Sequence, residues 1–437
     1  MNAASGSTGT VPNGKSGPVR QARAPFSNTS GEARPGSLSH SFRALRHRNY
    51  QYFIGGQIIS LVGTWMQTVA QSWLVYRLTH SDLLLGTAMF CSQIAVFALG
   101  PLGGLAADRF SRHKLVIVTQ TLMMVQAFVL AWLTLSGRIQ VWEILALAVV
   151  LGAINAFDIP GRQSLLIQMT SKQDLLSAIS LNSAVFNTAR GVGPAVAGVL
   201  VAALGEGVCF LLNAISFLAV IGGLLAMKLE PFERRAPVSP WRHLVDGFVY
   251  TWNRTKVRRI LAALGAATLA AAPILVLAPV FADQIFQRGS RGLGYLMGAM
   301  GIGAVVGTVG LARRTEVAGL PAVITYSALL LGVANFAFAA STDFYLSLAI
   351  TFVIGYSLMR QLAAANTTIQ TMIPDEYRGR VMSLYSMCVV GIGPFGSLAA
   401  GALASNFGPR LTMALGGVVS LVAGTLFGWS LRSDRNA

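Results

Sequence analysis

Three ionisable residues stand out inside long apolar runs of this chain: Asp158, Arg190 and Arg360. A charge placed in hydrocarbon costs at least about 2.5–3.5 kcal/mol, so such residues are candidates for function by default. Asp158 and Arg190 fall at comparable depth in consecutive apolar segments that run in opposite directions. They are expected to form either a buried ion pair that fixes packing or a coupling element in which Asp158 carries a proton.

A second pattern is a polar stripe in the first apolar run. Its five members recur at spacings of 3, 4, 3 and 4 residues and therefore share one helical face: Gln57, Ser60, Thr64, Gln67 and Gln71. Because lipid cannot satisfy these groups, the stripe must face protein or water. It is predicted to line a polar cavity wall; the alternative is a hydrogen-bonded packing seam.

The composition indicates what kind of protein positions these residues. Of 437 residues, 54% are hydrophobic and only 11% are charged, whereas a soluble globular chain carries about 25% charged residues. The formal net charge is +17, but the charges form short clusters between apolar runs rather than one basic surface. We therefore expect a membrane protein in contact with lipid, and no nucleic-acid partner.

Twelve apolar stretches are long enough to cross a bilayer, which takes about 20 residues. They lie near residues 50–76, 83–106, 115–136, 141–163, 175–203, 207–228, 260–285, 293–312, 320–340, 344–366, 381–404 and 410–430. The pattern predicts an all-α membrane protein with two groups of six helices. Most Lys and Arg residues fall on the side that holds both chain ends, which the positive-inside rule assigns to the cytoplasm.

A near-repeat supports two related halves. The sequence GVGP at 191–194 returns as GIGP at 391–394, a separation typical of duplicated membrane bundles. We predict a disordered cytoplasmic N-terminal tail (1–45), a six-helix bundle (46–229), a cytoplasmic central segment (230–258) and a second six-helix bundle with a short tail (259–437). The central segment is expected to hold an amphipathic helix with apolar positions at Trp241, Leu244, Val245, Phe248 and Trp252.

The loop after the second span carries a recognisable motif. It resembles the G-x3-D-[RK]-x-G-R-[RK] loop of the major facilitator superfamily, matching at Gly104, Asp108, Arg109 and Arg112, with Ser111 in place of the usual Gly. The resemblance implies two pseudo-symmetric six-helix bundles and a conformational gate. An anionic Asp108 at this helix end would hold one cytoplasmic closure and release it when the halves rock.

The fifth span contains a second motif of the superfamily. Gly193, Pro194 and Gly198 resemble the G-P-x-x-G-G element of its drug-exporting branches, with Ala197 replacing the first of the paired glycines. Small residues allow close helix contact, and Pro194 removes a backbone hydrogen bond. The resemblance implies export rather than import.

Three further stretches are similar to the enterobactin-exporter and macrolide-efflux branch, the transmembrane secretion effectors: residues 42–50, 156–163 and 378–385. The resemblance covers residues 42 to about 430. In the superfamily the first, fourth, seventh and tenth helices line a central cavity. The resemblance therefore implies that Asn155 lines the polar wall of this cavity and that Tyr356 lines a more apolar wall.

Other patterns carry little chemistry. Residues 9–16 fit the formal P-loop pattern but lack the strand and helix that phosphate binding needs, and the three cysteines are isolated. We expect no cofactor, no metal and no enzymatic activity. The sequence thus predicts a secondary exporter of an amphipathic small molecule, siderophore-like or macrolide-like, working by alternating access with proton antiport. It is expected to be a monomer in the bacterial inner membrane; the alternative is a non-transporting scaffold or receptor on a transporter fold.

Overall fold

The computed structural model describes residues 42–171, 173–229, 248–312 and 319–436. All of them belong to one compact unit, Ser39–Ala437. These residues form helices and no strand. A short 3₁₀ helix, η1 (Arg43–Arg46), precedes the first bundle. The first bundle consists of α2 (Arg48–Thr79), α3 (Asp82–Arg109), α4 (Arg112–Leu135), α5 (Val141–Met169), α6 (Leu175–Leu204) and α7 (Glu206–Leu225).

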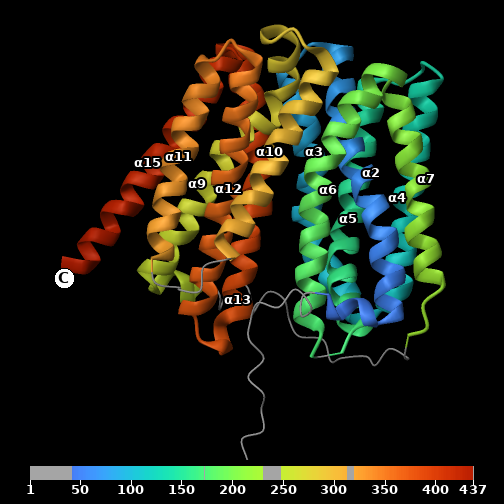
Figure 1. The fold of residues 1–437 in the computed structure, drawn as a ribbon, viewed down its shortest axis with the longest axis horizontal. Coiled ribbons are helices and arrows are strands. Elements are labelled where there is room, and N and C mark those ends of the chain that lie inside the picture. The colour runs from blue at the N-terminus through green and yellow to red at the C-terminus, as the bar shows by residue number, and fades with distance from the viewer. Residues whose placement is uncertain (1–41, 172, 230–247, 313–318, 437) are drawn as a thin grey trace, which may run out of the picture. The chain divides into compact units, whose positions relative to one another are not determined.

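The second bundle repeats this plan, with two π-helical segments inserted. It consists of α9 (Thr255–Val280) continuing into η2 (Phe281–Ile285), α10 (Gly289–Ala312), α11 (Leu320–Ala340), α12 (Phe344–Met372), α13 (Asp375–Ser386) with η3 (Met387–Gly391) and α14 (Ile392–Phe407), and α15 (Pro409–Asn436). In Figure 1 the first bundle stands on the right and the second on the left.

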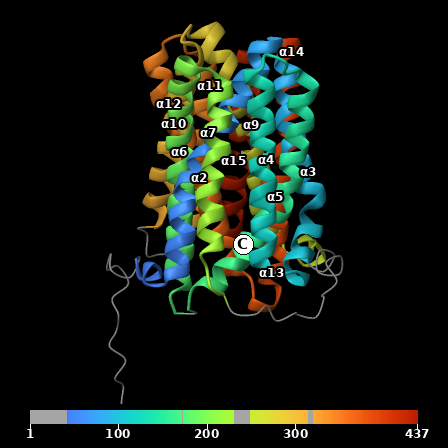
Figure 2. The same cartoon turned by 90° about the vertical axis from the view of Figure 1, so that its right-hand side faces the viewer.

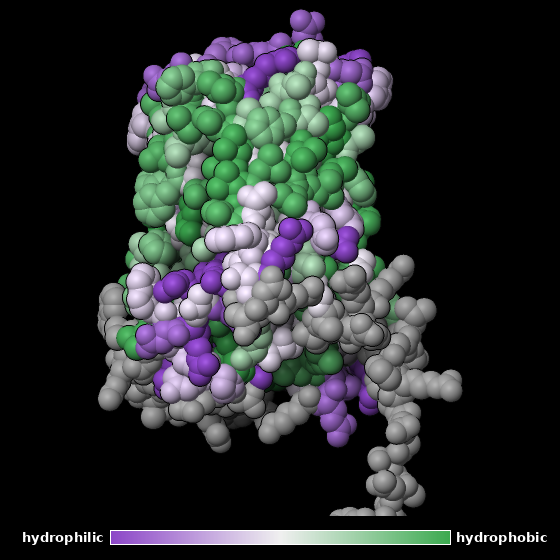
Figure 3. Space-filling model, turned by 90° about the vertical axis from the view of Figure 1, so that its left-hand side faces the viewer, coloured by the Kyte–Doolittle hydropathy of each residue, from purple (hydrophilic) through white to green (hydrophobic). Residues whose placement is uncertain are grey.

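Eleven of the described helices are long and apolar enough to cross a membrane; we predicted twelve such stretches. The difference is α2, which is 32 residues long but carries the polar stripe, and this lowers its mean hydropathy. Because α2 packs between α6 and α7, the bundle satisfies groups that lipid could not. Figure 3 shows the outer face of the second bundle, where a broad hydrophobic zone lies between hydrophilic residues at both ends.

The two ends of the helices differ in character. The basic end holds the start of α2, the α3–α4 and α5–α6 turns, the end of α7, the start of α9 and the α12–α13 turn. The opposite end holds the α2–α3, α4–α5, α6–α7, η2–α10, α11–α12 and α14–α15 turns. Contacts at the basic end include Asn49 Nδ2 to the Lys228 carbonyl at 2.8 Å. The other end is tied by Arg77 to Glu206 at 2.7 Å.

Some predicted boundaries shift. Residues 43–45, which we assigned to the disordered tail, form most of η1, and Ala44 is buried. In the central segment, residues 248–253 are helical, and the exposed rings of Phe248 and Trp252 stack with centroids 5.8 Å apart. Trp241, Leu244 and Val245 lie outside the described residues, as do the tail residues 1–41.

The two bundles join at the opposite end through α6–α10 and α3–α14. Close approach depends on glycine: a Cβ on Gly294 would lie 2.5 Å from the Gly198 Cα, and one on Gly86 would lie 2.6 Å from the Ser397 carbonyl oxygen. No larger side chain fits at such distances, as in other membrane helix pairs built on small residues. The labelled helices can be followed in Figures 1 and 2.

Towards the basic end the bundles part. On α3, one face meets the second bundle at Gly86, Phe90, Gln93 and Phe97, which contact Gly401, Phe395, Gly393 and Gly391 in turn. The next positions on this face are Gly100 and Gly104, and a Cβ on either would meet nothing within 4 Å.

The hydrophobic core shows the same asymmetry. One large cluster takes residues from both bundles, for example Leu74, Ala197, Phe281 and Leu296. Near the basic end the first bundle has its own cluster around Tyr50 and Leu165, and the second has a separate one around Leu264 and Ile369. The described residues therefore form a closed joint at the opposite end and two independent cores at the basic end.

Candidate functional site

Arg190 lies where the two bundles part. Its guanidinium stands over the Trp65 ring of α2, 5.4 Å from the ring centroid, and its Nη1 is 3.8 Å from the Met359 Sδ of α12 in the second bundle. Trp65 in turn packs edge-on against Phe186, with centroids 5.7 Å apart. We call Arg190, Trp65, Phe186 and Met359 the Arg190 cluster; it combines a cation, two aromatic rings and a thioether from three helices.

One face of α6 defines the position of this cluster. Ser183, Phe186, Arg190, Pro194 and Ala197 follow each other at spacings of 3, 4, 4 and 3 and share that face. Pro194 and Ala197 are buried in the joint between the bundles, whereas Ser183 is exposed and Phe186 is 41% exposed. Arg190 is half-buried and marks the transition.

The expected pair of Asp158 with Arg190 is not formed. Asp158 on α5 is fully buried and faces α4, where its Oδ1 accepts hydrogen bonds from Thr119 Oγ1 at 2.8 Å and Gln120 Nε2 at 2.9 Å. Its Oδ2 lies 2.5 Å from the Nε of Arg162, one turn along the same helix. The sequence-based pairing was wrong because depth along two helices does not determine which face each side chain occupies, and a local i, i+4 partner was overlooked.

The polar stripe of α2 lies largely in a packing seam. Gln67 donates to Gln126 Oε1 on α4 at 3.2 Å and accepts from Asn213 Nδ2 on α7 at 2.7 Å. Gln57 and Ser60 are also buried, each 3% exposed. The hydrogen-bonded seam, our alternative to the cavity wall, therefore describes Gln67, because α4 and α7 supply amide partners.

The remaining predicted wall residues are less deeply buried. Thr64 donates to the Ser60 carbonyl at 2.9 Å, and Asn155 donates to the Leu151 carbonyl at 3.0 Å. Gln71 is half-buried. Each of these two hydrogen bonds lies within a single helix, and within the described part of the chain neither side chain bonds to the Arg190 cluster. That Thr64, Gln71 and Asn155 line a cavity wall remains a prediction.

Tyr356 and Arg360 occupy a different place from the one expected. Arg360 donates to the Tyr356 hydroxyl on the same helix, and both line a pocket of about 280 Å³ with Tyr326 and Ser327 of α11. The backbone of Tyr356 packs against Gly303 and Gly307 of α10. The pair thus lies in a groove within the second bundle and not beside Arg190. The sequence could not show this, because the direction of these side chains depends on the rotation of α12 about its axis.

The gate motif lies at the basic end of α3. Asp108 is exposed and shares the face of Gly100 and Gly104 that has no neighbour from the described residues of the second bundle. Arg109 is exposed as well. Arg112 opens α4 and donates to the carbonyls of Ala107 at 3.5 Å and Ser164 at 3.4 Å, which ties the α3–α4 turn to α5. Arg112 therefore holds the turn of the motif, while Asp108 remains exposed at the end of α3.

The export motif of the fifth span, Gly193, Pro194 and Gly198, lies in α6 and forms part of the joint. Gly193 packs against α2, where a Cβ would lie 2.6 Å from that of Trp65, and Gly198 packs against Gly294 of α10. Pro194 lies inside α6 without ending it. These residues bring α6 close to α2 of its own bundle and to α10 of the second bundle, within about two turns of Arg190.

Two features were missed by sequence reasoning. Tyr76 of α2 donates to the Oδ2 of Asp283 in η2 at 2.9 Å, a bond between the bundles at the opposite end. Asp283 lies inside our predicted span 260–285, so its charge was a readable signal. Trp65, by contrast, gave no signal, because its role depends on which side chain reaches it across helices.

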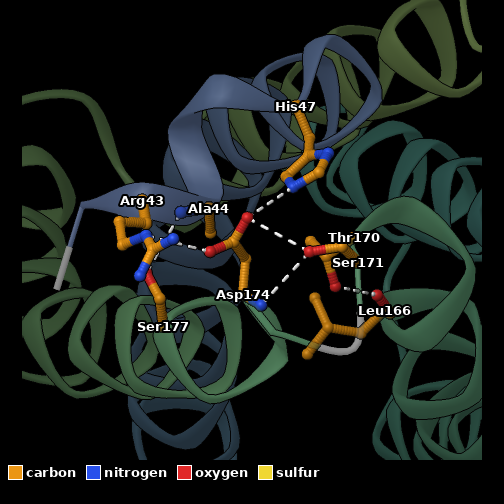
Figure 4. A network of polar contacts seen from close by, with 8 residues as sticks. All are labelled: Arg43, Ala44, His47, Leu166, Thr170, Ser171, Asp174 and Ser177. Atoms are coloured by element: carbon orange, nitrogen blue, oxygen red, sulfur yellow. Dashed lines mark hydrogen bonds and ion pairs between the residues drawn. The ribbon is translucent and has the colours of Figure 1, made fainter. Parts of the chain in front are cut away.

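A further polar network ties η1 to the start of α6 (Figure 4). Asp174 is the residue before the first turn of α6, and its carboxylate pairs with His47 Nε2 at 2.9 Å and Arg43 Nε at 3.2 Å. The hydrogen bond from His47 lowers the pKa of the Asp174 carboxyl, and a hydrogen bond from Ser171 and the positive charge of Arg43 lower it further. Ser177 Oγ also accepts from the Ala44 amide at 3.1 Å. The chain segment before α2 is thereby fixed to the bundle.

Comparison with known proteins identifies the family to which the chain belongs. Residues 39–434 match the family model described as transmembrane secretion effector. The chain belongs to this family. It is 24% identical to the staphyloferrin A transporter of Staphylococcus aureus over 382 residues, which cover 86% of this chain and 95% of that protein. It is 26% identical to the multidrug efflux pump Tap of Mycolicibacterium fortuitum over 361 residues, covering 80% and 88% of the two chains.

Solved structures agree on the fold of this transmembrane secretion effector. A bacterial homologue of the human lysosomal transporter Spinster, in an inward-facing and occupied conformation, superposes with a TM-score of 0.71 at 13% identity and covers 88% of this chain and 97% of its own. A point mutant of the nucleoside transporter NupG gives 0.66 at 14% identity, covering 88% and 98%. The protein is thus a multi-pass membrane transporter of the major facilitator superfamily, as predicted, and not an enzyme.

Proposed function

We propose that this transmembrane secretion effector exports an amphipathic small molecule by alternating access. The observation that carries the proposal is the arrangement around Arg190: the bundles are joined on one side of it and separate on the other. A solute entering from the basic end meets a cation beside two aromatic rings. Mixed polar and apolar groups of this kind suit an amphipathic ligand.

The gate motif supplies a means of closing the basic end. Asp108 lies on the same face of α3 as Phe97, which contacts Gly391 at the η3–α14 boundary. If the bundles rock about their joint, this face approaches the second bundle and carries Asp108 towards α13. An anion near a helix N-terminus is stabilised by the helix dipole, so Asp108 would favour the closed basic end.

The orientation and membrane follow from charge and relatives. With most Lys and Arg at the basic end, we assign this end and both termini to the cytoplasmic side by the positive-inside rule. The bacterial relatives support a bacterial inner membrane as the location. The described state then opens inward, the state in which an exporter takes up its solute. The names of the two relatives favour a siderophore-like or drug-like solute.

Proton antiport is the proposed driving force, with Asp158 as the proton site. Its carboxylate is buried and bound to Arg162, and a proton on Asp158 would release this guanidinium. Such an exchange converts protonation into a local rearrangement between α4 and α5.

Everted membrane vesicles test the export proposal directly. Cells with and without the protein are first compared for sensitivity to siderophores and macrolides and for their retention of these compounds. Vesicles from producing cells should then accumulate the identified solute when a proton gradient is imposed and lose it when the gradient is collapsed. Accumulation equal to that of vesicles lacking the protein would refute export and favour the non-transporting scaffold or receptor.

A further inference from the structure

Arg190 is a cation in a membrane span for which the described residues provide no carboxylate. Ion pairs among those residues include Arg43 and His47 with Asp174, Arg77 with Glu206, and Arg162 with Asp158, and none of them includes Arg190. Arg190 instead contacts a thioether and an aromatic ring. A guanidinium has five N–H donors, and a thioether is only a weak acceptor. Most of its hydrogen-bonding capacity is therefore unused.

Arg190 lies at the inner end of the exposed part of one face of α6. On the shared face of α6, the residues on its basic side, Ser183 and Phe186, are exposed, while Pro194 on its other side is buried in the joint. The Trp65 ring covers one face of the guanidinium, and the N–H donors of a guanidinium lie in its plane and point outwards from its edge. Arg190 is thus the last residue of the accessible part of this inter-bundle face. Through Met359 of α12 it also contacts the second bundle.

We propose that Arg190 is the binding site for a carboxylate on the transported solute. This inference rests on the proposed export function and specifies its substrate class: an amphipathic acid whose carboxylate accepts a bidentate hydrogen bond from the guanidinium. Trp65 and Phe186 receive the adjoining apolar part of the same molecule. Because charge without a partner is unfavourable in a membrane span, the solute anion supplies what the protein lacks at this position.

The contrast with Arg162 and Arg360 supports this assignment. Arg162 is neutralised by Asp158. Arg360 lies in the groove between α11 and α12 beside the Tyr356 hydroxyl, away from the inter-bundle face. Among these three span arginines, Arg190 alone combines an absent counter-ion in the described part of the chain with contacts to both bundles.

Matched acid and amide probes test the proposal while the natural solute is still unidentified. The purified protein is titrated with N-acetyltryptophan, salicylate and deoxycholate, and with the amide of each. Binding is read from thermal stability and, for the non-fluorescent deoxycholate pair, also from the tryptophan fluorescence of the protein. At least one acid should bind at least tenfold more tightly than its amide. Arg190→Gln should remove this preference, Arg190→Lys should retain part of it, and Arg360→Gln should behave as the unaltered protein.

The outcomes separate this inference from the export proposal. Equal binding of every acid and its amide, or an acid preference that survives in Arg190→Gln, would overturn the carboxylate site. Vesicle export of an uncharged solute at an unchanged rate by Arg190→Gln would also overturn it and leave export standing. Acid-selective binding that depends on Arg190, without accumulation of any solute in vesicles, would support the site and overturn export.

Discussion

The hydroxyl of Tyr76 donates a hydrogen bond to the Asp283 carboxylate at 2.9 Å, joining α2 of the first bundle to η2 of the second. Tyr76 is 1% exposed, and its ring packs against Trp73 and His80. The bond therefore stands at the edge of the large shared core, where separation of the bundles at the opposite end would have to break it.

Tyr76→Phe removes this bond while keeping the ring. Because a net hydrogen bond contributes about 0.5–1.5 kcal/mol, the opposite end should open about two- to tenfold more often. The reporter is Ser397→Cys, a buried position in the α3–α14 joint, in a variant without the three native cysteines. Its labelling by a membrane-impermeant maleimide should accelerate in Tyr76→Phe, and adding Asp283→Asn should cause little further change. Unchanged labelling would show that the bond does not hold the joint.

Glycine contacts between α6 and α10 should be needed for the same joint. A Cβ in Gly294→Ala would lie within 3 Å of backbone atoms of Pro194 and Gly198, so the helices must move apart. We expect faster labelling of the Ser397→Cys reporter and a lower melting temperature. Gly310→Ala on the same helix is the control, since a Cβ there meets nothing within 4 Å and alanine favours the helix by up to about 1 kcal/mol. Equal behaviour of the two variants would contradict the assigned joint.

Asp108 is expected to act through its charge. Asp108→Asn should leave membrane insertion and thermal stability unchanged, because the side chain is exposed, but should lower vesicle transport at least about tenfold, equivalent to about 1.4 kcal/mol in the balance of states. Asp108→Glu keeps the charge and should retain much of the activity. Transport by Asp108→Asn at the normal rate, at equal expression, would exclude a gating role.

The Asp158–Arg162 pair gives a prediction for stability. Asp158→Asn leaves the guanidinium of Arg162 without its carboxylate and should destabilise the protein by about 1–3 kcal/mol, less than for a fully buried pair because Arg162 is partly exposed. The double variant Asp158→Asn/Arg162→Gln should recover part of this loss in thermal unfolding. If Asp158 also carries the proton, the double variant should fold and exchange solute yet fail to accumulate it against a gradient. Gradient-driven accumulation by this variant would exclude Asp158 as the proton site.

Docking of η1 should depend on pH through Asp174. The pKa of this carboxyl is lowered in the folded protein, so its contribution is fully present above the unfolded value of about 3.9 and is lost as the pH falls through the lower folded value. Hydrogen exchange at the Ala44 amide, corrected for its intrinsic rate, should show protection that persists at pH 5 and weakens in stronger acid. Asp174→Asn should show weaker protection at neutral pH, and equal protection there would show that the Asp174 carboxylate does not hold η1.

The sequence by itself determined the membrane class, the two-bundle plan and most helix positions. The physical reason is that a bilayer imposes a length and a polarity on every spanning segment, and these are properties of each segment alone. The motifs around Asp108 and Pro194 were readable for a related reason, because backbone geometry at a turn or a close helix contact restricts the residue types allowed there.

Tertiary structure decided which side chains meet. Asp158 binds Arg162 and not Arg190, Gln67 lies in a seam with Gln126 and Asn213, and Arg360 belongs to a groove within its own bundle. Each outcome depends on the rotation of a helix about its axis, and that rotation is set by packing against several neighbours at once. The contact of Arg190 with Met359, 169 positions away in the chain, exists only because the two bundles pack together.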